Sequence, residues 1–554
     1  MNGKSRVYYW LALFALLVLL APLLAACGGG QVPEVGGDST PSTGEPASTA
    51  DEDAAAVTTP AVPPLAATTA GQLKSGTPPA AAQDRTTATP APAAGDSTID
   101  PNKQVTLTVW AAGYTPSRLV PTTAENRNAP KIKGIQPVVD AYQKLHPNVT
   151  IKLVVHPADD EVRRWMITQL TGGTAPDIMW TQPDWAAEDY RKGWWVPLDK
   201  YLQQPNPYVA EGQPGSERWS ELFQPQINVW KAANNSLYVA LADQVQVGIY
   251  YNQDVFQKAG LSGPPSTWEE LMQAAEKIKA AGMNPFAVSA KDLDMLTWVS
   301  GWLTNHFYYS QLGEMDTDGD KLLSKTEMAK AVKSGKYSFT DDRNKARLEQ
   351  LKRFASYWQR GAAGIDTDQA TRLFVSGRAG MMFSGSWFYK TLQEDPQRKF
   401  DFGVFYYPSV DSSTSPLVAD GVPPTNKAAG YGSFQYGVTN SAVKKGNADV
   451  AMDFLKFATA PKNLSPMIAE GGFSLPAVKG ADPVKGLEPF EESVAYPQGP
   501  YQEDDSMFDF EFAEKFLAIT SPFLTDGQSV DDTAQKLQAE MEKAADRILA
   551  GESE

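Results

Sequence analysis

The fold is decided by three short apolar segments: Val105-Thr-Leu-Thr-Val-Trp110, Val149-Thr-Ile-Lys-Leu-Val-Val155 and Ile178-Met-Trp180. The first two are rich in β-branched residues and the third is a short apolar run, so all three are predicted to be strands. Between the first two, apolar residues recur at helical spacing up to His146-Pro147, where the proline ends the helix. A second helix is expected from about residue 159 to residue 170. This alternation of strands and helices predicts an α/β fold with a parallel sheet.

Two of these strands end in tryptophan. In open α/β sheets, ligands bind beyond the carboxyl ends of the strands. Trp110 and Trp180 both stand at such an end. They are therefore the first candidates for contact with a ligand, with burial in the core as the alternative.

The extreme N-terminus has the pattern of a secretory signal. Lys4 and Arg6 precede an apolar run from residue 7 to residue 24, followed by Ala25, Ala26 and Cys27. The sequence Leu-Ala-Ala-Cys resembles a bacterial lipobox. That resemblance implies a signal peptide over residues 1–26, a lipid on the Cys27 sulfur, and a protein held at the extracytoplasmic face of the bacterial cell membrane. A signal peptide that merely contains a cysteine is the alternative.

Residues 27–103 are expected to form a lipidated, disordered tether. They are dominated by Ala, Pro and Thr, and no aromatic residue occurs between Gly28 and Asp100. Such a composition cannot bury enough apolar surface to offset the entropy lost on ordering. The remainder, roughly 450 residues, is too large for a single core and predicts two lobes.

Charge and motif content exclude several functions. The net charge of −16 argues against a nucleic-acid partner. One cysteine excludes a disulfide framework, and the three histidines are not at metal-ligand spacing. The GxSxG, HExxH, Walker and GxGxxG motifs are absent as well, which weakens the case for an enzyme without removing it. We expect a protein that is not an enzyme.

Several further stretches, taken in order, resemble one known family: the extracellular solute-binding proteins of ABC importers, in the branch that includes maltose-binding protein. The matching stretches are Gly173-Thr-Ala-Pro-Asp-Ile-Met-Trp180, Gly193-Trp-Trp-Val-Pro-Leu198, Tyr250-Tyr-Asn-Gln-Asp-Val-Phe256, Pro264-Pro-Ser-Thr-Trp-Glu-Glu270, Phe374-Val-Ser-Gly-Arg-Ala-Gly-Met381 and Gly385-Ser-Trp387.

The resemblance implies a two-lobed, type II periplasmic-binding-protein-like fold with hinge crossings. By analogy the N-terminal lobe comprises residues 104–243 and 408–465, and the C-terminal lobe comprises 244–407 and 466–554. Such a protein captures a solute by hinge closure and delivers it to a membrane permease. We expect it to be a monomer, with a mono- or oligosaccharide as the solute.

A sugar offers apolar faces to aromatic rings and a rim of hydroxyls to polar side chains. The resemblance therefore suggests these candidate contacts: Trp110, Trp180, Asp184, Asp243, Gln244, Trp298, Trp302 and Trp387, with another ring from Phe508, Phe510 or Phe512. The alternative for each tryptophan is core packing, to which Trp194, Trp195, Trp268 and Trp358 are assigned. Asp243 and Gln244 could equally be hinge residues.

Residues 316–327 have the spacing of the twelve-residue EF-hand calcium loop. The oxygens would come from the side chains of Asp316, Asp318, Asp320, Ser324 and Glu327 and from the Leu322 carbonyl. Lys321 stands where the loop normally has glycine, which is expected to weaken binding. We expect a structural Ca²⁺ ion, and a solvated acidic turn is the alternative.

Two other functions remain open from the sequence. A secreted carbohydrate-active enzyme would need two carboxylates about 5–10 Å apart across a cleft, and no such pair can be chosen. A binding protein for a peptide, a polyamine or an anion is the other alternative.

Overall fold

The computed structural model describes residues 99–120, 131–156, 162–224, 230–232, 234–319, 321, 323–422, 424–425, 432–494, 499–501, 503–504 and 507–553. The predicted signal peptide, Cys27 and nearly all of the predicted tether lie outside these residues. Among the described helices, none combines the length and the apolar character that a membrane crossing requires.

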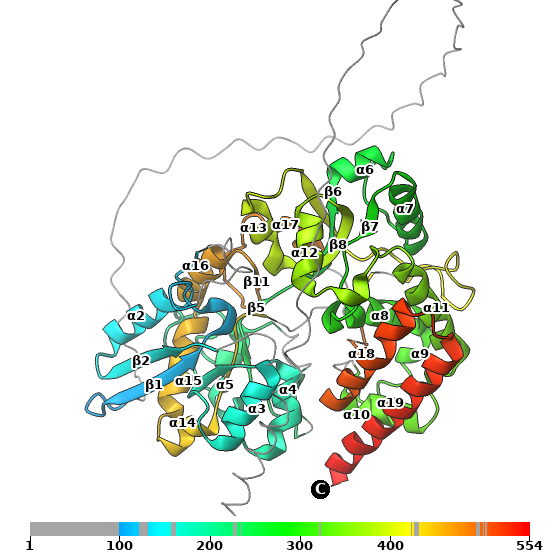
Figure 1. Ribbon diagram of the computed structural model, residues 1–554. Helices are drawn as coiled ribbons and strands as arrows, with labels where there is room; N and C mark the ends of the chain where they lie inside the picture. Colours follow the sequence, from blue (N-terminus) through cyan, green and yellow to red (C-terminus); the bar gives the residue numbers. More distant parts are fainter. Residues whose placement is uncertain are drawn as a thin grey trace, which may run out of the picture. The chain divides into compact units, whose positions relative to one another are not determined.

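The first lobe is built on a sheet with strand order β2-β1-β3-β10-β4, of which β1 and β2 are labelled in Figure 1. β1 pairs in parallel with β2 and β3, as predicted, whereas β10 is antiparallel to both β3 and β4. The strands are β1 (Val105–Trp110), β2 (Val149–Val154), β3 (Ile178–Trp180), β10 (Gln435–Val438) and β4 (Ala240–Leu241).

Helices cover both faces of this sheet. Alternation along β1 directs Val105, Leu107 and Val109 into one core and leaves Trp110 in another. The core around Val105 also contains residues of α2 and α15. The core around Trp110 also contains Met166 and Leu170 of α3. The helices of this lobe are α2 (Gln136–Leu145), α3 (Val162–Gly172), α4 (Pro183–Glu188), α5 (Asp199–Leu202), α14 (Asn440–Lys444), α15 (Ala448–Thr459) and α16 (Pro461–Gly471).

The second lobe has its own sheet, with strand order β7-β8-β6-β9. β7 is parallel to β8, and β6 is antiparallel to both of its neighbours. The strands are β6 (Val247–Asn252), β7 (Asn284–Phe286), β8 (Ala379–Gly385) and β9 (Phe402–Phe405).

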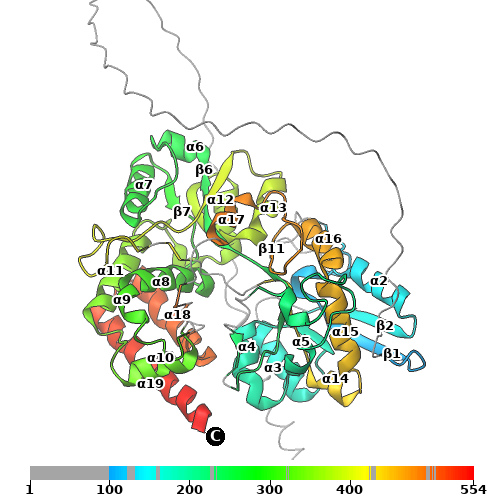
Figure 2. The ribbon, with the colours of Figure 1, turned by 180° about the vertical axis from the view of Figure 1, so that it is seen from behind.

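Long helices form most of the core of the second lobe, which is called the second core below. Figure 2 shows α10, α18 and α19 gathered together, and both α10 and α18 pack on α19. The helices are α6 (Gln253–Lys258), α7 (Trp268–Ala280), α8 (Leu293–Phe307), α9 (Tyr309–Leu312), α10 (Lys325–Lys333), α11 (Asp342–Ala355), α12 (Thr367–Val375), α13 (Ser386–Glu394), α17 (Glu488–Val494), α18 (Phe510–Thr525) and α19 (Val530–Ser553).

Two of the segments that cross between the lobes lie side by side. In the chain, β5 (Asp243–Gln244) lies between β4, at the edge of the first sheet, and β6 of the second sheet. It pairs with β11 (Leu475–Pro476) in antiparallel register, with Gln244 opposite Leu475.

Two predicted lobe boundaries differ from the structure. Val410 and Val418 belong to the second core, so the chain returns to the first lobe later than residue 408. α16 continues to Gly471 and packs on α2 and α15, so a boundary at residue 465 would cut a helix of the first lobe. Neither position could be located from the sequence, because the core that a segment joins depends on its packing against residues far away in the chain.

Candidate functional site

A group of tryptophans lies at the carboxyl ends of strands β1 and β3. The ring of Trp110 lies 4.9 Å from that of Trp165 and 5.8 Å from that of Trp180, in edge-to-face geometry. The ring of Trp185 lies 6.0 Å from that of Trp180. Trp110 is buried, whereas Trp165, Trp180 and Trp185 keep part of their surface exposed. These four residues are called the tryptophan cluster below.

The local structure explains why these rings meet. Because β1 and β3 are adjacent and parallel, with Trp110 opposite Met179, their terminal tryptophans reach the same edge of the sheet. Proline at the first position of α4 starts a helix directly after β3 and brings in Trp185. The buried guanidinium of Arg163 lies 5.1 Å above the Trp185 ring and forms a 2.7 Å ion pair with Asp189. Arg163, itself held by Asp189, therefore fixes the position of the Trp185 ring by covering one of its faces.

A second aromatic pair lies in the other lobe. Trp387, at the start of α13, is 39% exposed and is one of the few large apolar side chains on the described surface. Its ring lies 5.7 Å from that of Trp298 on α8. A Cβ built on Gly385 would overlap the Trp387 ring, so glycine is required at position 385 for the ring to lie against the backbone.

Five of the eight predicted contact residues lie in the interior, including Trp110 at 4% exposed and Asp184 at 7%. Trp302 is 2% exposed and stacks on Tyr407 at 4.8 Å, with Trp268 at 5.1 Å on another side. Asp243 is fully buried, and Gln244 is 6% exposed within the crossing strand β5. The structure thus brings Trp110 together with Trp180, and Trp298 together with Trp387. The buried members of the predicted set are Trp110, Asp184, Asp243, Gln244 and Trp302.

The Asp243 carboxylate gathers several donors. It accepts hydrogen bonds from the Tyr114 and Ser474 hydroxyls, both at 2.5 Å, and from the Phe434 N–H at 2.7 Å. Burial raises the pKa of Asp243, although the hydrogen bonds from Ser474 and Tyr114 oppose the shift. These contacts fit the hinge interpretation of Asp243 better than contact with a ligand.

Asp184, the remaining polar candidate, lies on α4 beside the tryptophan cluster and is 7% exposed. Its charge acts on Lys325 of the second lobe. Burial by itself would lower the pKa of Lys325, but Glu188 and Asp184 outweigh burial, and the pKa of Lys325 lies above its usual value.

Sequence reasoning missed three residues of this region: Trp165, Trp185 and Arg163. A signal for Trp185 was present, because Pro183 starts a new helix only two residues before it and three after a strand end. No comparable signal marks Trp165 or Arg163, whose roles depend on how α3 packs against the sheet. Phe508 and Phe512 are buried in the second core, and only Phe510 is partly exposed.

The EF-hand-like loop brings three carboxylates together. One oxygen from each of Asp316, Asp318 and Glu327 lies within 4.8 Å of the others. The backbone turns as such a loop must, with positive φ angles of 79° at Gly319 and 72° at Lys321. Burial by itself would raise the pKa of Glu327, but hydrogen bonds from Ser324 and Thr317 lower it below its usual value. Asp320 and Leu322 lie outside the described residues.

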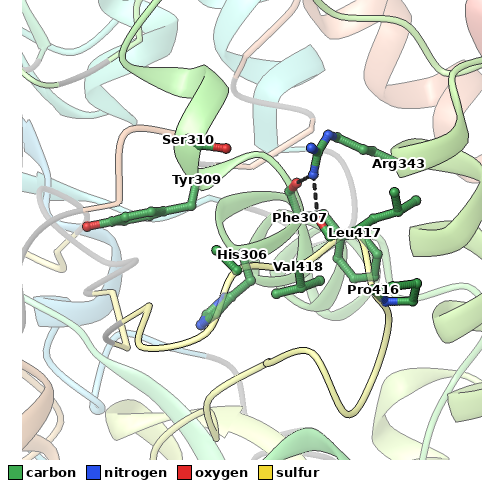
Figure 3. Close-up of a pocket in the computed structure, with 9 residues that line it drawn as sticks. His306, Phe307, Tyr309, Ser310, Arg343, Pro416, Leu417 and Val418 are labelled. Carbon is green, nitrogen blue, oxygen red and sulfur yellow. Dashed lines mark hydrogen bonds between the residues drawn. The ribbon is translucent and has the colours of Figure 1, made fainter.

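A separate pocket of about 200 Å³ lies in the second lobe, between the end of α8 and residues 416–419 (Figure 3). Arg343 borders it and donates to the carbonyl oxygens of Phe307, at 2.9 Å, and Leu417. None of the predicted contact residues lines this pocket.

Comparison with known proteins identifies the family. Residues 128–464, more than half of the chain, match the model of the bacterial extracellular solute-binding proteins. The chain therefore belongs to that family, which confirms the predicted resemblance and places the protein outside the cytoplasm. It is a family of binding proteins rather than of enzymes.

Individual relatives are distant. The chain is 25% identical over 264 residues to a binding protein of Brucella abortus, covering 48% of this chain and 57% of the relative. It is 24% identical over 293 residues to a multiple sugar-binding protein of Streptococcus mutans, covering 52% of this chain and 62% of that protein. The chain thus spans less than two thirds of these relatives.

Solved structures confirm the two-lobed α/β fold. A chitin oligosaccharide binding protein aligns with a TM-score of 0.58 at 20% identity, covering 80% of this chain and 99% of that one.

The Asp243 contacts predict a large stability effect. Asp243→Ala leaves buried donors of Tyr114, Ser474 and Phe434 without an acceptor, so the free energy of unfolding should fall by about 2–4 kcal/mol. Denaturant titration measures this change. Asp140→Ala, on the exposed side of α2, serves as the control and should change stability by no more than about 0.5 kcal/mol. Equal midpoints for the two variants would contradict the structural role of Asp243.

Proposed function

We propose that this protein captures a carbohydrate outside the cell and delivers it to the permease of an ABC importer. The observation that carries the proposal is the partly exposed tryptophan surface at the carboxyl ends of β1 and β3, together with exposed Trp387 and its neighbour Trp298. Flat aromatic rings suit the apolar faces of sugar rings. The sugar-binding relative and the oligosaccharide-binding structure of the same fold support this assignment.

Capture would proceed by closure about the paired crossing strands β5 and β11. A solute favours closure only if it binds the closed arrangement better than the open one. Rings supplied by both lobes meet this requirement, because a sugar can touch both sets at once only when the lobes approach. Asp243 anchors β5 to the first lobe, so that the lobe moves as a unit.

The sugar assignment predicts binding without turnover. Calorimetry against a panel of mono- and oligosaccharides should identify at least one ligand, and the recovered sugar should be unmodified. Trp387→Ala should weaken this ligand by about 5- to 30-fold, because it removes roughly 1–2 kcal/mol of ring contact.

Trp194→Ala is the matched control. Trp194 is also partly exposed and packs against the same core as the tryptophan cluster, but the Lys192 ammonium group lies over its ring, 4.7 Å from the centroid. It should leave affinity unchanged. Peptides, polyamines and inorganic anions form the remaining arms of the panel. Binding in one of these arms, with none among the saccharides, would replace the sugar assignment.

We further propose that the protein is anchored to the membrane through lipid on Cys27, which the lipobox-like sequence supports. Cells fed a labelled fatty acid should incorporate the label into the wild-type chain and retain it in the membrane fraction. Cys27→Ser should abolish labelling and release the protein. Retention of the label by this variant would contradict the anchor.

We propose, in addition, a structural calcium ion in the loop of residues 316–327. Support comes from the converging carboxylates of Asp316, Asp318 and Glu327 and from the left-handed turn at Lys321. These residues would hold the ion, whose charge would offset the repulsion among the carboxylates.

Calcium added after chelation should raise the melting temperature of the wild type, because an ion that binds only the folded state stabilises it. Glu327→Gln should abolish the calcium-dependent rise, whereas Glu314→Gln, exposed just before the loop, should retain it. Lys321→Gly should tighten calcium binding by about fivefold or more, because it relieves roughly 1–2 kcal/mol of backbone strain. No calcium-dependent shift in the wild type would refute the site.

A further inference from the structure

One ion pair connects α4, the helix that carries Trp185 of the tryptophan cluster, to the second lobe. The Lys325 Nζ lies 3.1 Å from the Glu188 Oε2, and the two side chains are 20% and 28% exposed. Glu188 is the last residue of α4, and Lys325 is the first residue of α10. The pair therefore joins segments that belong to different sheets and different cores.

Lys325 is surrounded by carboxylates from both lobes. Besides Glu188, it is influenced by Asp184 of the first lobe and by Asp509 of the second. Asp509 is itself engaged by Arg547. Glu188 and Asp184, both on α4, are thus the carboxylates of the first lobe that act on this ammonium group.

The backbone that carries Lys325 is fixed to the second lobe on both sides. Ser324 and Glu327 form a reciprocal capping box at the start of α10. Leu323 is buried, and its N–H donates to the Pro500 carbonyl at 2.9 Å. Because the backbone is held in this way, the ammonium group can follow Glu188 only as far as the lysine side chain reaches if the lobes separate.

A second pair across the lobes, Arg164 to Glu514 at 2.8 Å, has a different character. Its side chains are 59% and 49% exposed. Exposed pairs contribute little to stability, because water and salt screen them and two flexible side chains must be ordered. The partly desolvated Lys325 pair is screened less.

We propose that Lys325 and Glu188 form an electrostatic latch that favours the arrangement in which α4 and α10 are in contact. Asp184 adds to the attraction from the same helix. The latch goes beyond solute capture, because it biases the separation of the lobes before any solute is present. It does not depend on the identity of the solute.

The distance between spin labels on the two lobes tests the latch without any solute. Because Cys27 is the only cysteine, a full-length Cys27→Ser chain can be labelled selectively after Lys144→Cys and Glu349→Cys, at exposed positions of α2 and α11. Lys325→Gln should raise the ratio of separated to contacting lobes by about two- to fivefold. Glu188→Gln should have a similar effect, and the double variant should shift no further than either single one.

Lys333→Gln is the matched control. Lys333 lies on the same helix and forms a 2.6 Å pair with Asp546, but within the second lobe. This variant, and the charge-retaining Lys325→Arg, should keep the wild-type distance distribution. An unchanged distribution for Lys325→Gln would overturn the latch. Single-variant effects that add in the double variant would overturn it as well, because they would show that the two residues act independently.

Discussion

The buried carboxylate of Asp243 is the constraint on which the two-lobed arrangement depends. It accepts hydrogen bonds from Tyr114, from Ser474 on the approach to β11, and from Phe434 just before β10. These segments are far apart in the sequence, and all of them meet where the chain leaves the first lobe. A carboxyl group so deeply buried is tolerated only because several hydrogen-bond donors surround it. The result is a crossing strand whose position is fixed relative to the first sheet.

The parts of the fold that the sequence predicted were those with local signals. Alternating β-branched residues predicted β1 and β2, and the proline after His146 marked the end of α2. The antiparallel insertion of β10 had no local signal, because its partners β3 and β4 lie roughly 200 residues or more away in the chain. The return crossing was misplaced for the same reason, since Val410 and Val418 look alike as apolar residues in either core.

In the candidate site, too, the features with a local sequence signal were predicted and those set by packing were not. Strand ends predicted that Trp110 and Trp180 would lie together, since parallel neighbours end at one edge. Trp302 could not be separated from Trp298 by spacing, because α8 is apolar on nearly all sides and buries most of its residues. Only packing shows that Trp298 reaches Trp387 while Trp302 faces Tyr407. Similarly, nothing in the sequence marked Arg163 as the residue whose guanidinium lies over the Trp185 ring.

The close approach of Trp387 to Gly385 has a consequence for how a solute is recognised. A side chain pressed against its own backbone has few rotamers left to lose when a partner arrives. The entropy penalty that usually accompanies immobilising a large ring is therefore largely met during folding, and the contact is preorganised. It follows that substitution of Gly385 by any larger residue would displace the Trp387 ring and remove this preorganisation, even though Gly385 has no side chain that could contact a solute.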